Sequence, residues 1–388
     1  MISWFHSIIG DGARFINADE KKICKYTAEK GIMRETARGG SDMKSEELSP
    51  IIFYYYFDLS DTDAFCELLK RRFVESGHSR EIIFRNWNCY NEPPGRDGDV
   101  YCYDALLLTT LADEGYIRVL PDIIDTSRVF PWILDRSRIR NKIYGTPLMI
   151  CTNVLICREE DRLPARNIYE LPEGTTAPLK SLVMTYYLYT LCGLQDRKSE
   201  VVQTLKQIQR IMGAEAYTNS KFADYDGVER FDRGECRYLI GFTEDIRRLA
   251  PGNYRVTPVN FSDQPVNEMP LMMTDLVSLG TDIDTEKLLD CLDLMEIMAD
   301  SEFIYDLCTT NGKLQYMLPA DMSVYPRLAQ IDPIYEEFFR IAGNIDNGIL
   351  RFGKHFYTNY LQKEAELLQI LEEELGCDCE ELRTAAKT

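Results

Sequence analysis

Histidine is scarce in this chain, and its scarcity excludes several kinds of catalytic site. The three histidines are His6, His78 and His355, and none of them follows a predicted strand. A Ser–His or Cys–His hydrolase needs an imidazole base beside its nucleophile, so neither class fits this sequence. The HExxH zinc motif, paired CxxC motifs, the P-loop and a GxGxxG after a strand are also absent. We therefore expect neither a metal nor a cofactor.

Long apolar runs and an export signal are absent as well. No run reaches the roughly 18–20 apolar residues that cross a bilayer, so no membrane segment is expected. Residues 1–11 lack the basic segment of a secretory signal. The 12 cysteines are therefore interpreted as reduced thiols of a cytoplasmic protein, or of a secreted one if a signal has been removed. The net charge of −19 would repel phosphates, which argues against nucleic acid or an anionic membrane as a partner.

What is present is an alternation of β-branched and amphipathic segments over 388 residues, which is long enough for two lobes. Residues 51–57 and 82–84 predict strands with an amphipathic helix between them, and residues 100–103 predict a third strand that runs into a helix over 104–114. This βαβ–βα order is typical of a parallel sheet. Further strands are predicted at 238–242, 254–259 and 270–279, and further helices at 179–191, 199–212, from 243 onward, and at 286–299, 301–309, 333–342 and 359–375.

One apolar stretch, residues 145–157, predicts a buried strand with a polar centre at Cys151, Thr152 and Asn153. A second such strand lies near residue 275, and the two enclose an α/β segment. A chain that leaves one lobe, builds a second and returns would have this order, with a ligand cleft at the strand ends between the lobes. The predicted parts are an extension at 1–47, a first lobe at 48–149 plus 263–314, and a second lobe at 150–262 plus 315–388, with crossings near 150, 263 and 315.

The residues suited to chemistry are a cysteine and three acids. Cys151 is either a nucleophile or a small buried hydrophobe. Without histidine, its base would be a carboxylate whose pKa is raised by burial. Asp104 and Glu244 stand at strand-to-helix junctions, where they serve either a site or a helix N-terminus. Asp275 lies in an apolar strand, so it must be paired, hydrogen-bonded or functional.

Tyrosines are common near these positions. Tyr54 and Tyr56 share one face of the first predicted strand, Tyr90 precedes a loop, and Tyr225 lies within a polar loop. Each is either a packing residue of the core and rim or part of an aromatic wall. Such a wall would bind a flat, electron-poor ring by stacking and cation–π contact.

Several separate and collinear motifs make residues 51–353 resemble thiaminase I (thiamine pyridinylase). The resemblance implies the two-lobed α/β fold of type II periplasmic binding proteins. It also implies an enzyme that splits thiamine at its methylene bridge and replaces the thiazolium with an amine or a thiol. The matching segments are residues 86–94, 99–104, 144–153, 240–244, 270–278, 315–320, 333–335 and 351–353.

The resemblance also implies roles for individual residues. Cys151 matches the catalytic cysteine that adds to the pyrimidine ring, and Glu244 matches its base. Asp104 and Asp275 match carboxylates that bind the aminopyrimidine and the positive charge of the substrate. The tyrosines that match substrate-lining positions are Tyr90, Tyr225 and one or both of Tyr54 and Tyr56.

Two positions depart from the family pattern, which has tyrosines where this chain has Phe242 and Met273. Because these two hydroxyls are missing, a second hypothesis is an enzyme that acts on a different pyrimidine. A further alternative is a non-catalytic protein of the same fold that binds thiamine or a related pyrimidine. The predicted partners are thiamine and a small amine or thiol, and the chain is expected to be a monomer.

Overall fold

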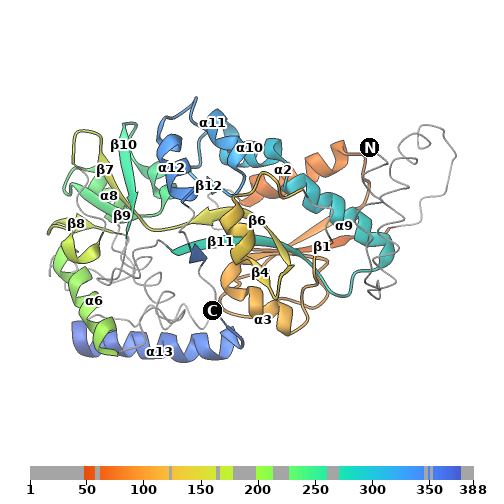
Figure 1. Cartoon of the computed structure of the whole chain (residues 1–388), viewed down its shortest axis with the longest axis horizontal. Coiled ribbons are helices and arrows are strands. Elements are labelled where there is room, and N and C mark those ends of the chain that lie inside the picture. Colours follow the sequence, from red (N-terminus) through yellow and green to blue (C-terminus); the bar gives the residue numbers. More distant parts are fainter. Residues whose placement is uncertain are drawn as a thin grey trace, which may run out of the picture. The chain divides into compact units, whose positions relative to one another are not determined.

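Two β-sheets organise the chain from Ser49 onward, as Figure 1 shows. The computed structural model describes residues 48–56, 62–121, 125–162, 167–177, 198–212, 227–259, 271–344, 348–349 and 353–376. The chain divides after Leu48, and every element below belongs to the unit Ser49–Thr388. The predicted extension at 1–47 and the predicted helix at 179–191 lie outside the described residues.

The larger sheet has seven strands in the described residues, in the order β12-β6-β11-β3-β1-β2, with β13 paired to β11. β1 pairs in parallel with both β2 and β3, as predicted, but β11 runs antiparallel to β3 and to β6. The prediction of parallel pairing is therefore confirmed for β1, β2 and β3, and the sheet as a whole is mixed. The chain leaves the sheet at the carboxyl end of β6 and returns at the same edge through β11, which fixes the antiparallel direction. The strands are β1 (Ile51–Tyr55), β2 (Ile82–Asn86), β3 (Val100–Asp104), β6 (Gly145–Cys151), β11 (Leu271–Leu279), β12 (Leu318–Pro319) and β13 (Gly348–Ile349).

The smaller sheet has the order β10-β7-β9-β8. Its strands are β7 (Val154–Arg158), β8 (Thr175–Thr176), β9 (Tyr238–Gly241) and β10 (Tyr254–Pro258). The stretch 145–157, predicted as one strand, is thus two strands in different sheets, joined by Thr152 and Asn153. No glycine or proline marks this break, so local sequence gives no turn signal.

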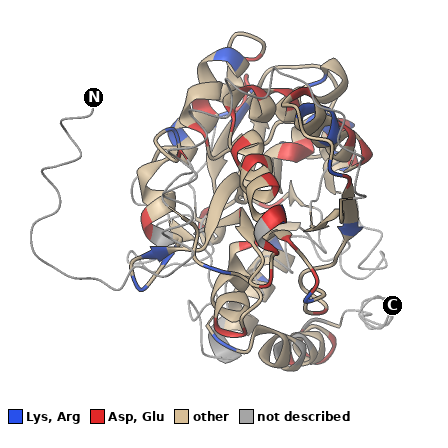
Figure 2. Cartoon of the chain, turned by 90° about the vertical axis from the view of Figure 1, so that its right-hand side faces the viewer, with Lys and Arg blue, Asp and Glu red and all other residues tan. Residues whose placement is uncertain are grey.

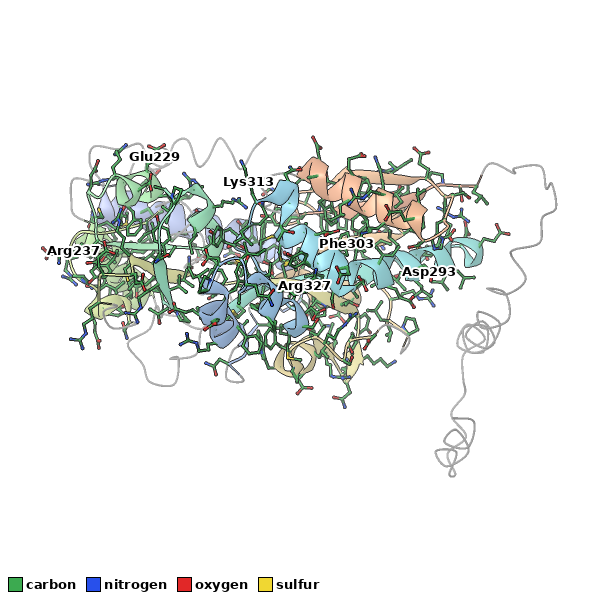
Figure 3. All side chains as sticks on the ribbon, turned by 90° about the horizontal axis from the view of Figure 1, so that it is seen from above. Glu229, Arg237, Asp293, Phe303, Lys313 and Arg327 are labelled. Atoms are coloured by element: carbon green, nitrogen blue, oxygen red, sulfur yellow. The ribbon has the colours of Figure 1, made fainter. Side chains whose placement is uncertain are left out.

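Helices cover both faces of the larger sheet (Figure 1). α2 (Thr62–Glu75), α9 (Thr285–Met298) and α10 (Ser301–Cys308) pack against one another on one face. Phe303 of α10, labelled in Figure 3, meets Phe65 of α2 with ring centroids 6.1 Å apart. On the other face, η2 (Ala105–Leu107) and α3 (Leu108–Asp113) form the helix predicted at 104–114, with a 3₁₀ first turn. In the sequence between β3 and β6 lie α4 (Pro131–Arg136) and the separate hairpin of β4 (Arg138–Ile139) and β5 (Lys142–Ile143).

The smaller sheet has its own helices. The predicted helices at 199–212, 333–342 and 359–375 are confirmed as α6 (Lys198–Met212), α12 (Ile334–Ala342) and α13 (Phe356–Leu375). α12 packs on β10, and α13 packs on α6 (Figure 1). The remaining elements are η3 (Ile168–Glu170), α8 (Gly227–Asp232), η4 (Thr243–Arg248), η6 (Thr310–Gly312), η7 (Met322–Val324) and α11 (Tyr325–Leu328).

The predicted lobe boundaries stay a prediction. One observation bears on them: β12 and β13 come from the stretch 315–388, which the sequence assigned to the second lobe, yet both pair with strands of the larger sheet. That stretch therefore adds strands to the larger sheet, while its helix α12 packs on β10 of the smaller one.

The surface charge is spread over many elements. Figure 2 shows acidic residues on helices across the visible face, with basic residues among them. Within the described part of the chain, no helix has the length and apolar character needed to span a bilayer.

A buried contact between hydroxyls fixes β11 against β3. The hydroxyls of Tyr103 and Ser278 lie 2.7 Å apart, and both residues are fully buried. Gly145 lies opposite Ser278 on β6, and a Cβ there would come within 2.7 Å of the Ser278 Oγ atom. The missing side chain at Gly145 thus makes room for the serine hydroxyl.

Ser278→Ala is expected to lower the free energy of unfolding by about 1–3 kcal/mol, because a buried hydroxyl loses this partner. Tyr103→Phe removes the other half of the contact. The double variant should lose less than the sum of the two single variants, by about 1 kcal/mol. Urea unfolding of all four proteins measures this coupling. Strictly additive losses would contradict it.

Candidate active site

Cys151 is the last residue of β6 and lies where the chain passes from the larger sheet to the smaller one. Of the cysteines in the described residues, Cys151 is partly exposed and all the others are buried. Cys157 on β7 is buried, as predicted, and burial raises the pKa of its thiol to about 11. Exposure therefore selects Cys151 as the candidate nucleophile among the described thiols.

Strand pairing brings two carboxylates to the same face of the sheet as Cys151. Met273 on β11 lies opposite Cys151, and Asp275 lies opposite Asp104 on β3. Residues directly opposite point to one face with Cβ atoms about 4.5–5.5 Å apart, and diagonal neighbours lie about 7–8 Å apart. Because Met273 and Asp275 are two residues apart on one strand, the thiol and both carboxylates share one face at one edge. Met273 lies between them.

Asp104 is buried and has two hydrogen-bond donors. The Tyr90 hydroxyl and the backbone N–H of Leu106 each donate to it over 2.8 Å. The second bond makes Asp104 the N-cap of η2. The carboxylate therefore stabilises the start of this helix in addition to being a candidate site residue. Burial raises its pKa to about 6, although both hydrogen bonds act in the opposite direction.

The predicted tyrosines are distributed unevenly around Asp104. Tyr90 bonds to it and packs edge to face against Tyr56, with ring centroids 5.2 Å apart. The Tyr54 hydroxyl instead donates to Asp97 over 3.0 Å and accepts from Arg85 over 2.7 Å. Tyr90 therefore lies beside the carboxylate with Tyr56 packed against its ring, whereas the Tyr54 hydroxyl bonds to Asp97 and Arg85. Tyr225 lies outside the described residues.

Glu244 approaches from the smaller sheet. It is half-buried in η4, directly after β9. β9 pairs antiparallel with β7 through Gly241 and Val154, so the segment with Cys151 and the segment with Glu244 leave this pair at the same end.

Glu244 is the acid whose ionisation is best suited to proton transfer at neutral pH. Burial raises its pKa from 4.5 to about 7. A hydrogen bond from the Thr243 hydroxyl, 3.1 Å long, and the charge of Arg247 act in the opposite direction. A base with a pKa near 7 is well matched to removing a proton from a thiol or an amine.

Sequence reasoning gave no role to two polar residues at this junction. The Asn153 Oδ1 and Arg247 Nη1 atoms are both buried and have no hydrogen-bond partner in the described part of the chain. Arg247 precedes Arg248, and such a pair in sequence is typical of a solvated helix end, so no local signal distinguished it.

The candidate residues are a partly exposed thiol, an acid whose pKa lies near 7, and two further carboxylates, of which Asp104 has aromatic neighbours. This set suits nucleophilic addition to a cationic aromatic ligand. The convergence of Cys151, Glu244 and Asp275 around one small molecule stays a prediction, as do the individual roles of the site residues.

Asp104→Asn is expected to fold with nearly unchanged stability, because asparagine is also a good N-cap. Asp104→Ala removes the cap and should lower the free energy of unfolding by about 1–2 kcal/mol. Thermal unfolding of both variants separates the structural role from the charge. If Asp104→Asn were as destabilised as Asp104→Ala, the cap would not explain the burial of this residue.

No protein-family model matches this chain. The chain is similar to Thiaminase-1 of Paenibacillus thiaminolyticus, with 27% identity over 341 residues that cover 76% of this chain and 81% of that relative. Its structure is similar to that of Clostridium botulinum thiaminase I in complex with thiamin, with a TM-score of 0.74 and 21% identity over 83% of this chain and 100% of that one. It is also similar to maltose-bound MalE3 of T. maritima, with a TM-score of 0.59 and 14% identity over 85% and 97% of the two chains. The predicted two-lobed fold of periplasmic binding proteins and the predicted resemblance to thiaminase I are therefore confirmed.

Proposed function

We propose that this chain, which resembles thiaminase I in sequence and in fold, is a transferase that cleaves thiamine. The observation that carries the proposal is the placement of Cys151. It is the partly exposed cysteine of the described residues. It precedes β7, and Glu244 follows β9, so both residues are connected to the same end of the antiparallel β7–β9 pair. A thiaminase I solved in complex with thiamin supports thiamine as the substrate.

The first half of the proposed reaction forms a covalent adduct. The Glu244 carboxylate takes the proton of the Cys151 thiol, and the thiolate adds to a carbon of the pyrimidine ring. The electron density gained by the ring expels the substituent on the exocyclic methylene. The bond between the methylene carbon and the thiazolium nitrogen breaks, and its electron pair leaves with a neutral thiazole.

The second half transfers the pyrimidine to the acceptor. Glu244 first releases the thiol proton to solvent, and an amine or thiol then attacks the methylene carbon and gives its proton to Glu244. The ring expels the Cys151 thiolate, which takes this proton from Glu244, so that the aromatic ring and the enzyme are restored. Asp104 and Asp275 would hold the protonated ring and so stabilise the adduct electrostatically. Every step uses side chains of this chain.

Cys151→Ser is expected to lower the rate of thiamine consumption by at least about 10²-fold, because the hydroxyl is far less acidic than the thiol. The assay measures thiamine loss with an added amine or thiol and identifies the product by mass. Cys66→Ser is the matched control, because Cys66 lies on α2 outside the site. Equal turnover by wild type and Cys151→Ser would refute the role of this cysteine.

The alternative function is a binding protein that holds thiamine or a related pyrimidine without reaction. It predicts measurable affinity, unchanged ligand and no mass increase at Cys151 after incubation with thiamine. The raised pKa of Glu244 favours the enzyme, because a binding site for a cation gains nothing from a carboxyl that is largely protonated below pH 7.

Glu244→Gln is expected to reduce turnover by about 10²- to 10⁴-fold, because the base is lost. In wild type, kcat/KM should rise with pH through about 7 as Glu244 ionises.

The stability of the folded chain should show the opposite dependence on pH. The unfolded chain ionises this group near pH 4.5 and the folded chain near 7, so stability is lost as pH rises between these values.

Glu244→Gln should therefore be more stable than wild type above pH 7, by on the order of 1–3 kcal/mol, and should lose this advantage below about pH 4.5. Denaturant unfolding at pH 4 and pH 8 measures the difference. A variant with lower stability at pH 8 would show that the carboxylate is held by stabilising contacts and is no poised base.

A further inference from the structure

Arg247 places a guanidinium group three residues after Glu244 in η4. The residue is half-buried in η4, and its Nη1 atom is buried with no hydrogen-bond partner in the described residues. A buried guanidinium N–H that lacks an acceptor destabilises the free protein, because its hydration is lost and not replaced. A ligand that supplies an acceptor would remove this penalty.

The local helix type sets the direction of this side chain. η4 is a 3₁₀ helix, in which residues three apart eclipse one another because a turn takes about three residues. Arg247 therefore lies on the same face as Glu244, one turn further along. The charge of Arg247 acts on Glu244, which agrees with this placement.

The neighbouring arginine differs in each of these respects. Arg248 is exposed, and its guanidinium lies 3.6 Å from the carboxylate of Asp245. The two arginines thus have the same chemistry and adjacent positions, but one is paired at the surface and the other carries its unmatched N–H beside the proposed base. Arg248 is a matched control for Arg247.

The chemistry of Arg247 does not suit the cationic part of thiamine. A guanidinium binds carboxylates, sulfonates and phosphates, with two parallel hydrogen bonds where geometry allows. Two sources could supply such a group: the acceptor, or a phosphate ester of thiamine. In the proposed reaction Glu244 lies where protons are exchanged with the attacking groups, so a group bound one turn away belongs to the acceptor side.

We infer that Arg247 binds an anionic group of the acceptor, so that the enzyme prefers amines or thiols that also carry a carboxylate or sulfonate. This inference rests on the proposed function and names the class of its second substrate. Arg247 would orient the acceptor so that its nucleophilic atom faces both Glu244 and the methylene carbon.

The test compares 3-mercaptopropionate with its methyl ester as acceptor at saturating thiamine. Wild type should favour the acid in kcat/KM by about 10- to 100-fold, mainly through KM. In Arg247→Gln this preference should fall to near one, and in Arg248→Gln it should persist. Arg247→Lys should restore part of it, because the charge remains.

Two outcomes overturn the inference. If Arg247→Gln lowers kcat/KM for acid and ester alike, or only shifts the pH profile, Arg247 tunes Glu244 and does not bind the acceptor. If the loss appears with thiamine monophosphate and not with thiamine, the anion comes from the thiamine side.

A binding measurement separates this inference from the proposed reaction. Calorimetric titration of 3-mercaptopropionate into Cys151→Ser, with thiamine present, needs no turnover. The inference is supported, even without catalysis, if the double variant Cys151→Ser, Arg247→Gln loses this binding and the double variant Cys151→Ser, Arg248→Gln keeps it. Equal binding by both double variants refutes it, whatever the activity of wild type.

Discussion

The antiparallel pairing of β11 with β6 and β3 is the constraint on which the site depends. It sets Met273 opposite Cys151 and Asp275 opposite Asp104, and so fixes the thiol and two carboxylates on one face. A shift of one residue would turn Asp275 to the other face of the sheet. The contact between Tyr103 and Ser278 lies further along the β3–β11 ladder and holds the register of that pair in the core, whereas the β6–β11 ladder shifts its register between Asp275 and Leu276.

The candidate residues and their neighbours include groups whose burial destabilises the folded chain. Burial raises the pKa of Asp104 to about 6 and that of Glu244 to about 7, and the Arg247 Nη1 atom has no acceptor in the described residues. Each of these groups lowers the stability of the folded chain at neutral pH relative to a well-paired one. Unfavourable burial of this kind is typical of binding and catalytic sites, because a ligand can supply the missing partners.

Several features follow from local pattern. The helices α6, α9, α10, α12 and α13 and the strands β1, β2, β3, β9, β10 and β11 were predicted close to their observed bounds, because periodic apolar residues and turn signals are encoded within each segment. The resemblance to thiaminase I also came from short motifs along the chain and is confirmed by comparison with known proteins. The candidate residues Cys151, Glu244, Asp104 and Asp275 were all named from such local signals.

Tertiary structure decided what periodicity could not reach. The break after Cys151 separates strands of two sheets, although apolar residues flank it on both sides; only the pairing partners differ. The same is true of the antiparallel direction of β11, the attachment of Tyr54 to Asp97, and the unmatched Nη1 of Arg247. The sequence by itself determined which segments form strands and helices and which residue types can do the chemistry, because those properties are local. Which side chains meet, and which remain without a partner, depends on contacts between residues far apart in the chain.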